Sequence, residues 1–376
     1  MSRAFITGAQ AIVQGAVDSG CDFYAGYPIT PATPILLGMV RALPPRGGIA
    51  IQAEDEIAAI GFCIGAAMTN RRAMTATSGP GMSLYSENIG FAIMAEVPLV
   101  IVDVQRMGPA TGGATTPAQG DLQFVRWGTS GGFPVVALAP ENAEQCYRLT
   151  VKAFELAERL RAPVFLLADK EVVMTAETVD PERLKSAGPV TPRRTAPPEG
   201  PYLSYGFDRP EDVPAFSPFG GPHVVRVNTS THDEGGYLTK DPAKVERLNR
   251  HLVAKIEAAA PDVEDVALDL QEGADTLVVS YGVSARSAAD AVREARRLGR
   301  AVSLAVVHSV WPFPKAAITR ALAGVLHLVV AELNFGQLRL EVERVVEAGQ
   351  RVTGVHRVDG ELITPGAILQ AILQQA

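Results

Sequence analysis

Three consecutive carboxylates, Glu54, Asp55 and Glu56, stand directly before residues 57–69, whose apolar positions follow a helical period. Acids at the amino end of a helix are stabilised by the helix dipole, by about 0.3–1 kcal/mol each, so capping is the simpler explanation. Three adjacent acids nevertheless exceed what capping needs. One of them can point into a cleft instead, because open α/β sheets place their ligands beside the carboxyl ends of strands.

A proline-rich loop at residues 26–34 offers hydroxyl groups in a rigid frame. Pro28, Pro31 and Pro34 recur at intervals of three and fix the backbone, which holds Thr30 and Thr33 in place before any ligand arrives. A stiff loop with a threonine as helix N-cap explains the same residues without a ligand. Both interpretations stay open on the residues alone.

Two further segments follow predicted strands. Ser78 and Gly79 come directly after the strand expected at 73–77, where glycines let a ligand approach the backbone, although the segment matches neither common glycine-rich nucleotide-binding pattern. Arg106 follows the strand expected at 99–104. A guanidinium there is suited to clamp a substrate carboxylate through two hydrogen bonds, and a surface arginine is the alternative.

The elements that must position these residues form an α/β protein. Residues 9–185 alternate patterns for buried strands with patterns for helices, which indicates one parallel sheet with helices on both faces. The strands are expected at 73–77, 99–104 and 164–168, and the helices at 9–19, 57–69, 84–94 and 142–161.

The rest of the chain divides into a connector and a second α/β unit. Nine prolines between residues 186 and 222 exclude a regular helix or a central strand, so we expect an extended connector there. Later patterns predict strands at 276–281, 301–307, 327–332 and 352–358, and helices at 284–298 and 337–348. The predicted domains are therefore 1–185, a proline-rich connector and loop segment at 186–265, and 266–376.

The composition excludes several classes of protein. A chain of 376 residues with 47% hydrophobic and 20% charged residues is typical of a soluble protein of two or three domains. A net charge of −7 without a long basic run disfavours nucleic acid as a partner. No apolar run approaches the ~18–20 residues of a membrane span, so we expect no membrane contact and a cytoplasmic, unprocessed chain.

No metal site is predicted in this chain. Cys21, Cys63 and Cys146 are too far apart for any C-x-x-C pair, so the chain alone cannot hold an iron–sulfur cluster or a structural zinc in the usual way. Cys63 is expected in the core, on an apolar helix face. His232 and the two acids after it cannot all face one ion in an extended chain, and we interpret residues 231–235 as a loop motif.

Taken together, the four strand-end segments resemble a known family. In their order and spacing they are similar to the α subunit of 2-oxoacid:ferredoxin oxidoreductases, of the 2-oxoglutarate synthase type. Three later segments resemble the same family, so the likeness covers nearly the whole chain. The segments are Ala-Gly-Tyr-Pro-Ile-Thr-Pro (25–31), Ala-Glu-Asp-Glu-Ile-Ala-Ala-Ile-Gly (53–61), Thr-Ser-Gly-Pro-Gly (77–81), Gln-Arg-Met-Gly-Pro-Ala-Thr-Gly (105–112), Thr-His-Asp-Glu-Gly (231–235), Glu-Leu-Asn-Phe-Gly-Gln (332–337) and Asp-Gly-Glu-Leu-Ile-Thr-Pro (359–365).

The resemblance implies an α/β fold with a thiamine-diphosphate pyrimidine-binding domain followed by a domain like the C-terminal domain of transketolases. It implies that Glu54 is catalytic and hydrogen-bonds the pyrimidine N1′, and that Thr30 and Arg106 bind the substrate. One departure is Ala110, where many relatives have a serine. The cofactor-binding residues implied are Tyr27, Pro28, Ile29, Glu54, Ser78 and Gly79.

Half of the coenzyme site is missing from the sequence. A diphosphate–Mg²⁺ site usually has Gly-Asp-Gly followed by an asparagine. The near match at 120–122 has Leu122 as its third residue, and only nineteen residues separate Leu122 from Asn142, so we reject it. The resemblance therefore implies an obligate β subunit that holds the diphosphate, Mg²⁺ and an iron–sulfur cluster, with γ and ferredoxin-like δ subunits as further partners.

The implied reaction is oxidative decarboxylation of a 2-oxoacid to an acyl-CoA and CO₂, with coenzyme A as co-substrate and ferredoxin as electron acceptor. It is reversible as reductive carboxylation. We favour 2-oxoglutarate on the resemblance, while pyruvate, branched-chain and aryl 2-oxoacids stay open. A transketolase-like carboligase and a non-catalytic scaffold subunit are the less favoured alternatives.

Overall fold

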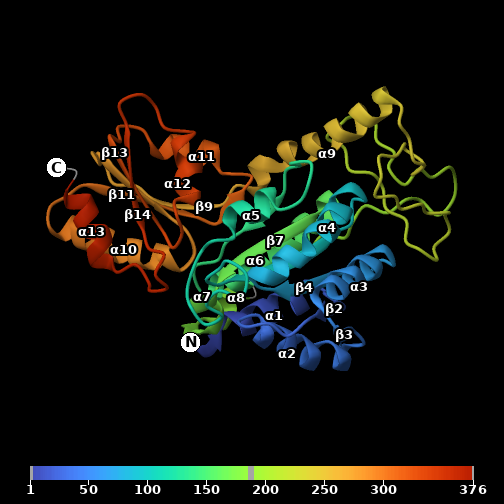
Figure 1. The fold of residues 1–376 in the computed structure, drawn as a ribbon, viewed down its shortest axis with the longest axis horizontal. Coiled ribbons are helices and arrows are strands. Elements are labelled where there is room, and N and C mark those ends of the chain that lie inside the picture. Colours follow the sequence, from blue (N-terminus) through green and yellow to red (C-terminus); the bar gives the residue numbers. More distant parts are fainter. Residues whose placement is uncertain (1–2, 185–189, 375–376) are drawn as a thin grey trace.

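The computed structural model describes residues 3–184 and 190–374, which form two α/β units with a long helix beside them (Figure 1). Helix α9 (Pro242–Val263) runs along the first unit and leads into the second. Within the described ranges, no helix is both long and apolar enough to cross a membrane.

The first unit is built on a seven-stranded sheet in the order β12-β6-β7-β5-β4-β2-β3. All neighbouring pairs except β12–β6 are parallel, as predicted for this part of the chain. The central strands β4, β5 and β7 are buried at every residue because helices cover both faces. The strands are β2 (Phe23–Gly26), β3 (Ile49–Gln52), β4 (Ala73–Thr77), β5 (Leu99–Gln105), β6 (Val136–Leu138), β7 (Pro163–Asp169) and β12 (Ser309–Trp311).

Two separate sets of helices cover this sheet. Helices α1, α2 and α6 pack in one hydrophobic cluster, and α3 and α4 pack in the other. Polar caps set the helix starts: Thr7 and Gln10 form a capping box at α1, and Asn142 accepts a 2.8 Å hydrogen bond from the Gln145 amide at α6. The helices are α1 (Gly8–Asp18), α2 (Thr33–Ala42), η1 (Pro44–Arg46), α3 (Glu56–Met68), α4 (Gly79–Met94), α5 (Leu122–Trp127), α6 (Ala143–Leu160), α7 (Lys170–Met174) and α8 (Pro181–Leu184).

The second unit has a five-stranded sheet in the order β14-β13-β10-β11-β9, in which only β9 is antiparallel to its neighbour. Helix α12 ends at Glu343, earlier than the predicted 337–348, and α10 begins two residues before the predicted Ser284. The elements are β9 (Val266–Asp269), β10 (Thr276–Ser280), α10 (Gly282–Arg297), β11 (Val302–Val307), α11 (Lys315–Ala321), β13 (His327–Glu332), α12 (Gln337–Glu343), β14 (Arg351–His356) and α13 (Pro365–Leu373). A small antiparallel ribbon joins β1 (Ala4–Thr7) to β8 (Ala176–Val179).

The two units share a strand. β12 belongs by sequence to the segment 266–376, yet it pairs with β6 at the edge of the first sheet. The Trp311 indole nitrogen also donates a 2.9 Å hydrogen bond to the carbonyl oxygen of Leu122 in the first unit. The second unit is therefore joined to the first by backbone pairing as well as by side chains.

The segment expected as connector and loop, 186–265, is only partly irregular. Residues 190–222 form no helix or named strand, as the prolines predict, and one isolated bridge pairs Thr195 with Phe216. The expected boundary at 185–186 lies outside the described residues. Toward its end the segment forms α9, which was expected to be loop. Asp241 caps this helix by accepting from the Ala243 and Lys244 amides.

Helix α9 is fixed to the first unit by buried charges. The Lys255 ammonium donates a 2.7 Å hydrogen bond to the carboxylate of Glu96, and the His251 ring lies 3.1 Å from the same oxygen. Burial alone raises the pKa of Glu96, but the charge of Lys255 and the contact with His251 hold it below its usual range. Apolar residues of α9 also belong to the hydrophobic cluster that contains α1, α2 and α6.

Candidate active site

The four predicted segments lie together at the carboxyl ends of the strands in the first sheet. Strands β3, β2, β4 and β5 are neighbours and parallel, so their carboxyl ends point the same way. Thr30, Glu54, Ser78 and Arg106 follow those four strands in the chain. The carboxyl ends of the strands are the position where open α/β sheets bind ligands.

Arg106 and Thr30 are in direct contact. The Arg106 side chain is buried, with 5% of its surface exposed, and its Nη1 donates to the backbone carbonyl oxygen of Thr30. Its Nη2 donates a 3.2 Å hydrogen bond to the carbonyl of Thr111. Its buried Nε has no partner among the described residues. The interpretation of Arg106 as a surface residue is therefore wrong, and Nε is the guanidinium nitrogen that has no partner.

The three acids before α3 have three different environments. Asp55 is the N-cap, and its carboxylate accepts a 2.7 Å hydrogen bond from the Ala58 amide. Glu56 is buried, and its side chain packs closely against the backbone of Gly81. Glu54 is exposed, and among the described residues its carboxylate has no hydrogen bond or ion pair. Capping thus explains only Asp55, and Glu54 is the carboxylate left free for a ligand.

The residues beside Glu54 fit the aminopyrimidine of thiamine diphosphate. The Ser78 hydroxyl is fully buried without a hydrogen-bond partner among the described residues, and at Gly79 the backbone is open, with only Asp121 within 4 Å of where a Cβ would lie. Tyr27 and Pro28 are exposed beside them. A free carboxylate, an unpaired hydroxyl and accessible backbone are the groups that an aminopyrimidine needs, because it offers both donors and acceptors.

The loop that starts at Arg106 is anchored by Gln119, a residue that the sequence analysis did not single out. Gln119 is fully buried, and its amide nitrogen donates to Asp169 at 2.9 Å and to the Tyr281 carbonyl at 3.1 Å. Its amide oxygen accepts from the Ser284 hydroxyl and the Leu333 amide, each at 2.9 Å. One side chain therefore joins the first sheet to the second unit.

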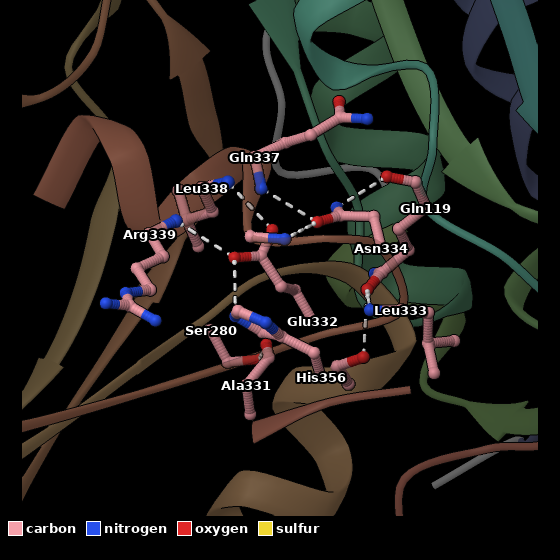
Figure 2. Close-up of polar contacts among 12 residues, drawn as sticks. Gln119, Ser280, Ala331, Glu332, Leu333, Asn334, Gln337, Leu338, Arg339 and His356 are labelled. Carbon is pink, nitrogen blue, oxygen red and sulfur yellow. Dashed lines mark hydrogen bonds and ion pairs between the residues drawn. The ribbon is translucent and has the colours of Figure 1, made fainter. Parts of the chain in front are cut away.

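Asn334, in the motif at 332–337, completes this junction (Figure 2). Its side-chain amide nitrogen donates a 2.7 Å hydrogen bond to the backbone carbonyl of Gln119, while its oxygen accepts from the amides of Gly336 and Gln337 at 2.8 Å. The Gln337 side chain donates to the carbonyl of Gly120 at 2.7 Å. This family motif therefore holds the loop that carries Arg106.

Glu332 in the same motif secures the start of α12. Its carboxylate accepts hydrogen bonds from the backbone amides of Leu338 at 2.7 Å and Arg339 at 2.9 Å, as Figure 2 shows. Burial raises the pKa of Glu332, and these two amides oppose the increase. The carboxylate satisfies helix amides that otherwise lack partners, so its role is structural.

A pair of acids, the buried Asp103 and the half-buried Asp121, was also missed. Asp103 interrupts the apolar run of β5, which is the one sequence signal that marks it. Asp121 belongs to the segment 120–122 that was rejected as a magnesium motif, and it forms a carboxyl–carboxyl hydrogen bond with Asp103. No group of three His, Cys, Asp or Glu side chains is placed to hold a metal ion in the described part of the chain.

The side chains of residues 232–234 have separate partners. His232 is buried, packs at a tilt against Tyr205 with ring centroids 4.0 Å apart, and contacts the Ser230 carbonyl. Asp233 accepts from backbone amides of its own loop, and Glu234 pairs with Arg247. They organise the loop, as expected. Separately, Cys63 is buried in the core, as predicted, and burial raises its pKa to about 12.

Comparison with known families decides what this site belongs to. Residues 14–250 match the family described as Pyruvate flavodoxin/ferredoxin oxidoreductase, thiamine diP-bdg, and residues 274–368 match Pyruvate:ferredoxin oxidoreductase core domain II. The chain belongs to the 2-oxoacid:ferredoxin oxidoreductase family. The first match makes the unit containing Glu54 and Arg106 the thiamine-diphosphate-binding domain of this oxidoreductase.

Two curated relatives of this oxidoreductase chain show matches over nearly their whole length. The 2-oxoglutarate synthase subunit KorA of Methanothermobacter thermautotrophicus is 41% identical, over 98% of this chain and 98% of its own length. The ketoisovalerate oxidoreductase subunit VorB of Methanothermobacter marburgensis is 34% identical, over 100% of this chain and 99% of its own. Both relatives are named as subunits, so each of them is one part of a larger enzyme.

A solved 2-oxoglutarate:ferredoxin oxidoreductase from Magnetococcus marinus, with 2-oxoglutarate, coenzyme A and succinyl-CoA bound, has the same fold. It superposes with a TM-score of 0.93 at 30% identity, covering 99% of this oxidoreductase chain, which spans 65% of the solved chain. A split-gene transketolase matches with a TM-score of 0.55 at 13% identity. That second likeness concerns the fold alone and confirms the predicted transketolase-like architecture.

Proposed function

We propose that this chain is the α subunit of a thiamine-diphosphate-dependent enzyme that oxidatively decarboxylates 2-oxoglutarate. The products are an acyl-CoA, CO₂ and reduced ferredoxin, and the reverse reaction is reductive carboxylation. The observation that carries the proposal is the position of the unpaired Glu54 carboxylate. It follows a strand whose carboxyl end lies beside those of the strands that precede Thr30 and Arg106, and these two residues are in contact. The 41% identity to 2-oxoglutarate synthase subunits over nearly the full length supports this choice of substrate.

Glu54 acts on the coenzyme in this proposal. Bound thiamine diphosphate supplies an electron sink that accepts the electrons left when CO₂ departs. The Glu54 carboxylate accepts a hydrogen bond from the protonated pyrimidine N1′ and so holds that proton in place. The hydroxyl of Ser78 and the backbone at Gly79, with the loop from Tyr27 to Ile29, form the surface on which the pyrimidine rests.

Arg106 and Thr30 act on the substrate. The guanidinium is already held by two backbone carbonyls, and its unpaired Nε–H can donate to a substrate carboxylate without a new ordering cost. The Thr30 side chain is exposed beside it. Its hydroxyl can supply a second hydrogen bond to the 2-oxoacid. Buried Arg106 thus fixes the substrate carboxylate, and Thr30 fixes its orientation.

The rest of the enzyme comes from partner chains in this proposal. A β subunit supplies the diphosphate site, Mg²⁺ and an iron–sulfur cluster, because the three cysteines of this chain are each buried and separate. Further γ and ferredoxin-like δ subunits pass electrons to ferredoxin. The exposure of Glu54 supports a covering subunit, since this chemistry needs water to be excluded.

A substrate panel on the co-purified complex tests the proposal. Viologen reduction is measured with coenzyme A and 2-oxoglutarate, pyruvate, 3-methyl-2-oxobutanoate or an aryl 2-oxoacid. We expect the highest kcat/KM with 2-oxoglutarate and no sustained turnover when coenzyme A is left out. A preference for 3-methyl-2-oxobutanoate would move the chain to the substrate class in the name of its 34% identical relative. Acyl or ketol transfer without viologen reduction would contradict the oxidoreductase and favour a carboligase.

A further inference from the structure

Two carboxyl groups face one another beneath the predicted substrate site. Asp103 lies on β5 and is fully buried, and among the described residues neither of its side-chain oxygens receives a hydrogen bond from a conventional donor. Its contact is a carboxyl–carboxyl hydrogen bond with Asp121, whose Oδ2 likewise lacks any other partner in the described chain. Such a contact requires a proton on one carboxyl, because two carboxylates have no donor between them.

The pair lies between the two binding segments. The Asp121 Oδ2 is 3.8 Å from where a Cβ of Gly79 would stand, next to the predicted coenzyme loop. On its other side, the charge of Arg106 acts on the Asp121 carboxyl. The backbone amide of Asp121 also donates to the side chain of Gln105, the residue before Arg106, at 3.3 Å. Asp121 is therefore attached to the strand end that carries the guanidinium.

The other titratable groups around the pair leave Arg106 as its cation. Besides Arg106, the titratable groups that interact with Asp103 or Asp121 are Asp169 on β7 and Tyr281 before α10. Asp169 is itself buried, with a pKa of about 7 because burial raises it, and its oxygens accept from Gln105 and Gln119. Neither Asp169 nor Tyr281 supplies a positive charge.

We propose that Asp103 and Asp121 share one proton, that the Asp121 carboxylate is the counter-charge of Arg106 before substrate arrives, and that the pair takes up a second proton when the substrate carboxylate reaches Arg106. The proposal rests on the proposed function, in which Arg106 binds that carboxylate. The proton comes from solvent and returns to it when the anion leaves, and no bond to the substrate is formed or broken. Asp103 and Asp121 are positioning residues, since neither contacts the substrate in this scheme.

The electrostatics fix the sign of the effect. Burial raises the pKa of Asp103 well above its usual range, so Asp103 holds the shared proton. Burial also raises the pKa of Asp121, to about 6, although Asp103 and Arg106 oppose the increase. A substrate anion beside Asp121 raises that pKa further. The complex therefore binds the 2-oxoacid most tightly at low pH, and its affinity falls as the pH rises through the raised pKa of the pair.

The test compares two isosteric variants in the co-purified complex, with KM for 2-oxoglutarate measured from pH 5.5 to pH 8.5. In the wild type we expect KM to rise with pH, by about tenfold for each unit by which the substrate raises the pKa of Asp121. Asp121→Asn removes the counter-charge, so its KM stays low at all pH values. Asp103→Asn donates an amide proton to Asp121 and keeps it ionised, so its KM stays at the high-pH value.

A second measurement does not depend on turnover. The infrared spectrum of the complex at pH 7.5 should contain the carbonyl band of a buried protonated carboxyl, and Asp103→Asn should remove it. Absence of that band from the wild type, or a KM for Asp121→Asn that rises with pH as in the wild type, would overturn the proposal. A complex that turns over no 2-oxoacid would refute the proposed function, and the infrared band would still decide the acid pair.

Discussion

The backbone carbonyl of Gln119 accepts a 2.7 Å hydrogen bond from the side-chain amide of Asn334, and this contact joins the loop that begins at Arg106 to the C-terminal unit. The side chain of Gln119 extends the junction to Asp169 on one side and Ser284 on the other. The position of Arg106, the proposed substrate ligand, therefore depends on a unit that contributes no residue to the predicted coenzyme site. The family motif at 332–337 has its physical explanation in this junction.

Replacing Gln119 with alanine should weaken both stability and substrate binding. The change leaves the Leu333 amide and the Asp169 carboxyl with fewer partners in a buried site, and each such group costs about 1–3 kcal/mol. We expect a lower free energy of unfolding in urea and a raised KM for the 2-oxoacid. Gln14→Ala, at an exposed glutamine with one side-chain contact, is the matched control and should change neither.

Arg106→Met should raise KM for the 2-oxoacid far more than it changes coenzyme affinity. Removing one partner of a desolvated charge pair costs about 2–5 kcal/mol, or roughly thirty-fold to several-thousand-fold in binding. Methionine keeps much of the packing of the arginine stem, so the loss reports charge. Exposed Arg41→Met is the control. A KM change below about threefold with viologen reduction intact would place the substrate clamp in the partner chain.

The isolated chain should bind thiamine diphosphate weakly. The diphosphate and Mg²⁺ supply much of the coenzyme's affinity, and the segment at 120–122 that most resembles their motif directs Asp121 to Asp103 and Arg106. Calorimetric titration of the chain alone, with and without Mg²⁺, measures this directly. Tight binding that depends on Mg²⁺ would mean that this chain carries a diphosphate site of its own.

Lys255→Met should destabilise the fold through α9. The change leaves the Glu96 carboxylate buried without its ammonium partner, and breaking a buried ion pair costs about 3–5 kcal/mol. We expect a loss of that size in urea unfolding at pH 7. Lys315→Met, at an exposed lysine, is the control and should have little effect.

The same pair predicts a pH dependence. In the wild type the pKa of Glu96 is held below its unfolded value of about 4.3, so its contribution is fully present above that pH and is lost as the pH falls toward the folded pKa. Without Lys255 the strongest group that opposes burial is gone, so the pKa of Glu96 rises and its ionised form stabilises the fold less at higher pH. The difference in unfolding free energy between variant and wild type should therefore shrink from pH 8 to pH 5. A constant difference would show that Lys255 contributes packing alone.

The parallel core of the first unit could be predicted because its strands are buried on both faces. β4 spans the predicted residues 73–77, and β5 and β7 extend the predicted strands by one or two residues. β12 could not be predicted, since three residues carry no periodicity and its partner β6 lies far away in the sequence. Helix α9 was missed because the whole segment 186–265 was predicted as connector and loop from the prolines in its first part. Asp241 and Pro242 are nevertheless a usual helix start.

The candidate site could likewise be predicted only in part. Strand-end segments are visible in sequence because glycine, proline and charged residues follow apolar runs, and this placed Thr30, Glu54, Ser78 and Arg106 together. The contact of Arg106 with the Thr30 carbonyl depends on backbone geometry that no spacing encodes. Gln119 is a single polar residue in a loop, and its importance appears only when both units surround it.

The central claim is that Glu54 activates the coenzyme, and proton exchange at C2 of thiamine diphosphate in the co-purified complex, followed by NMR, tests it most directly. Glu54→Gln should leave the complex assembled and slow the exchange by roughly 10²-fold or more, because an amide cannot hold the proton at N1′. Asp55→Asn is the matched control, since asparagine keeps the cap of α3 and should leave exchange unchanged. Exchange in Glu54→Gln as fast as in the wild type would contradict the account.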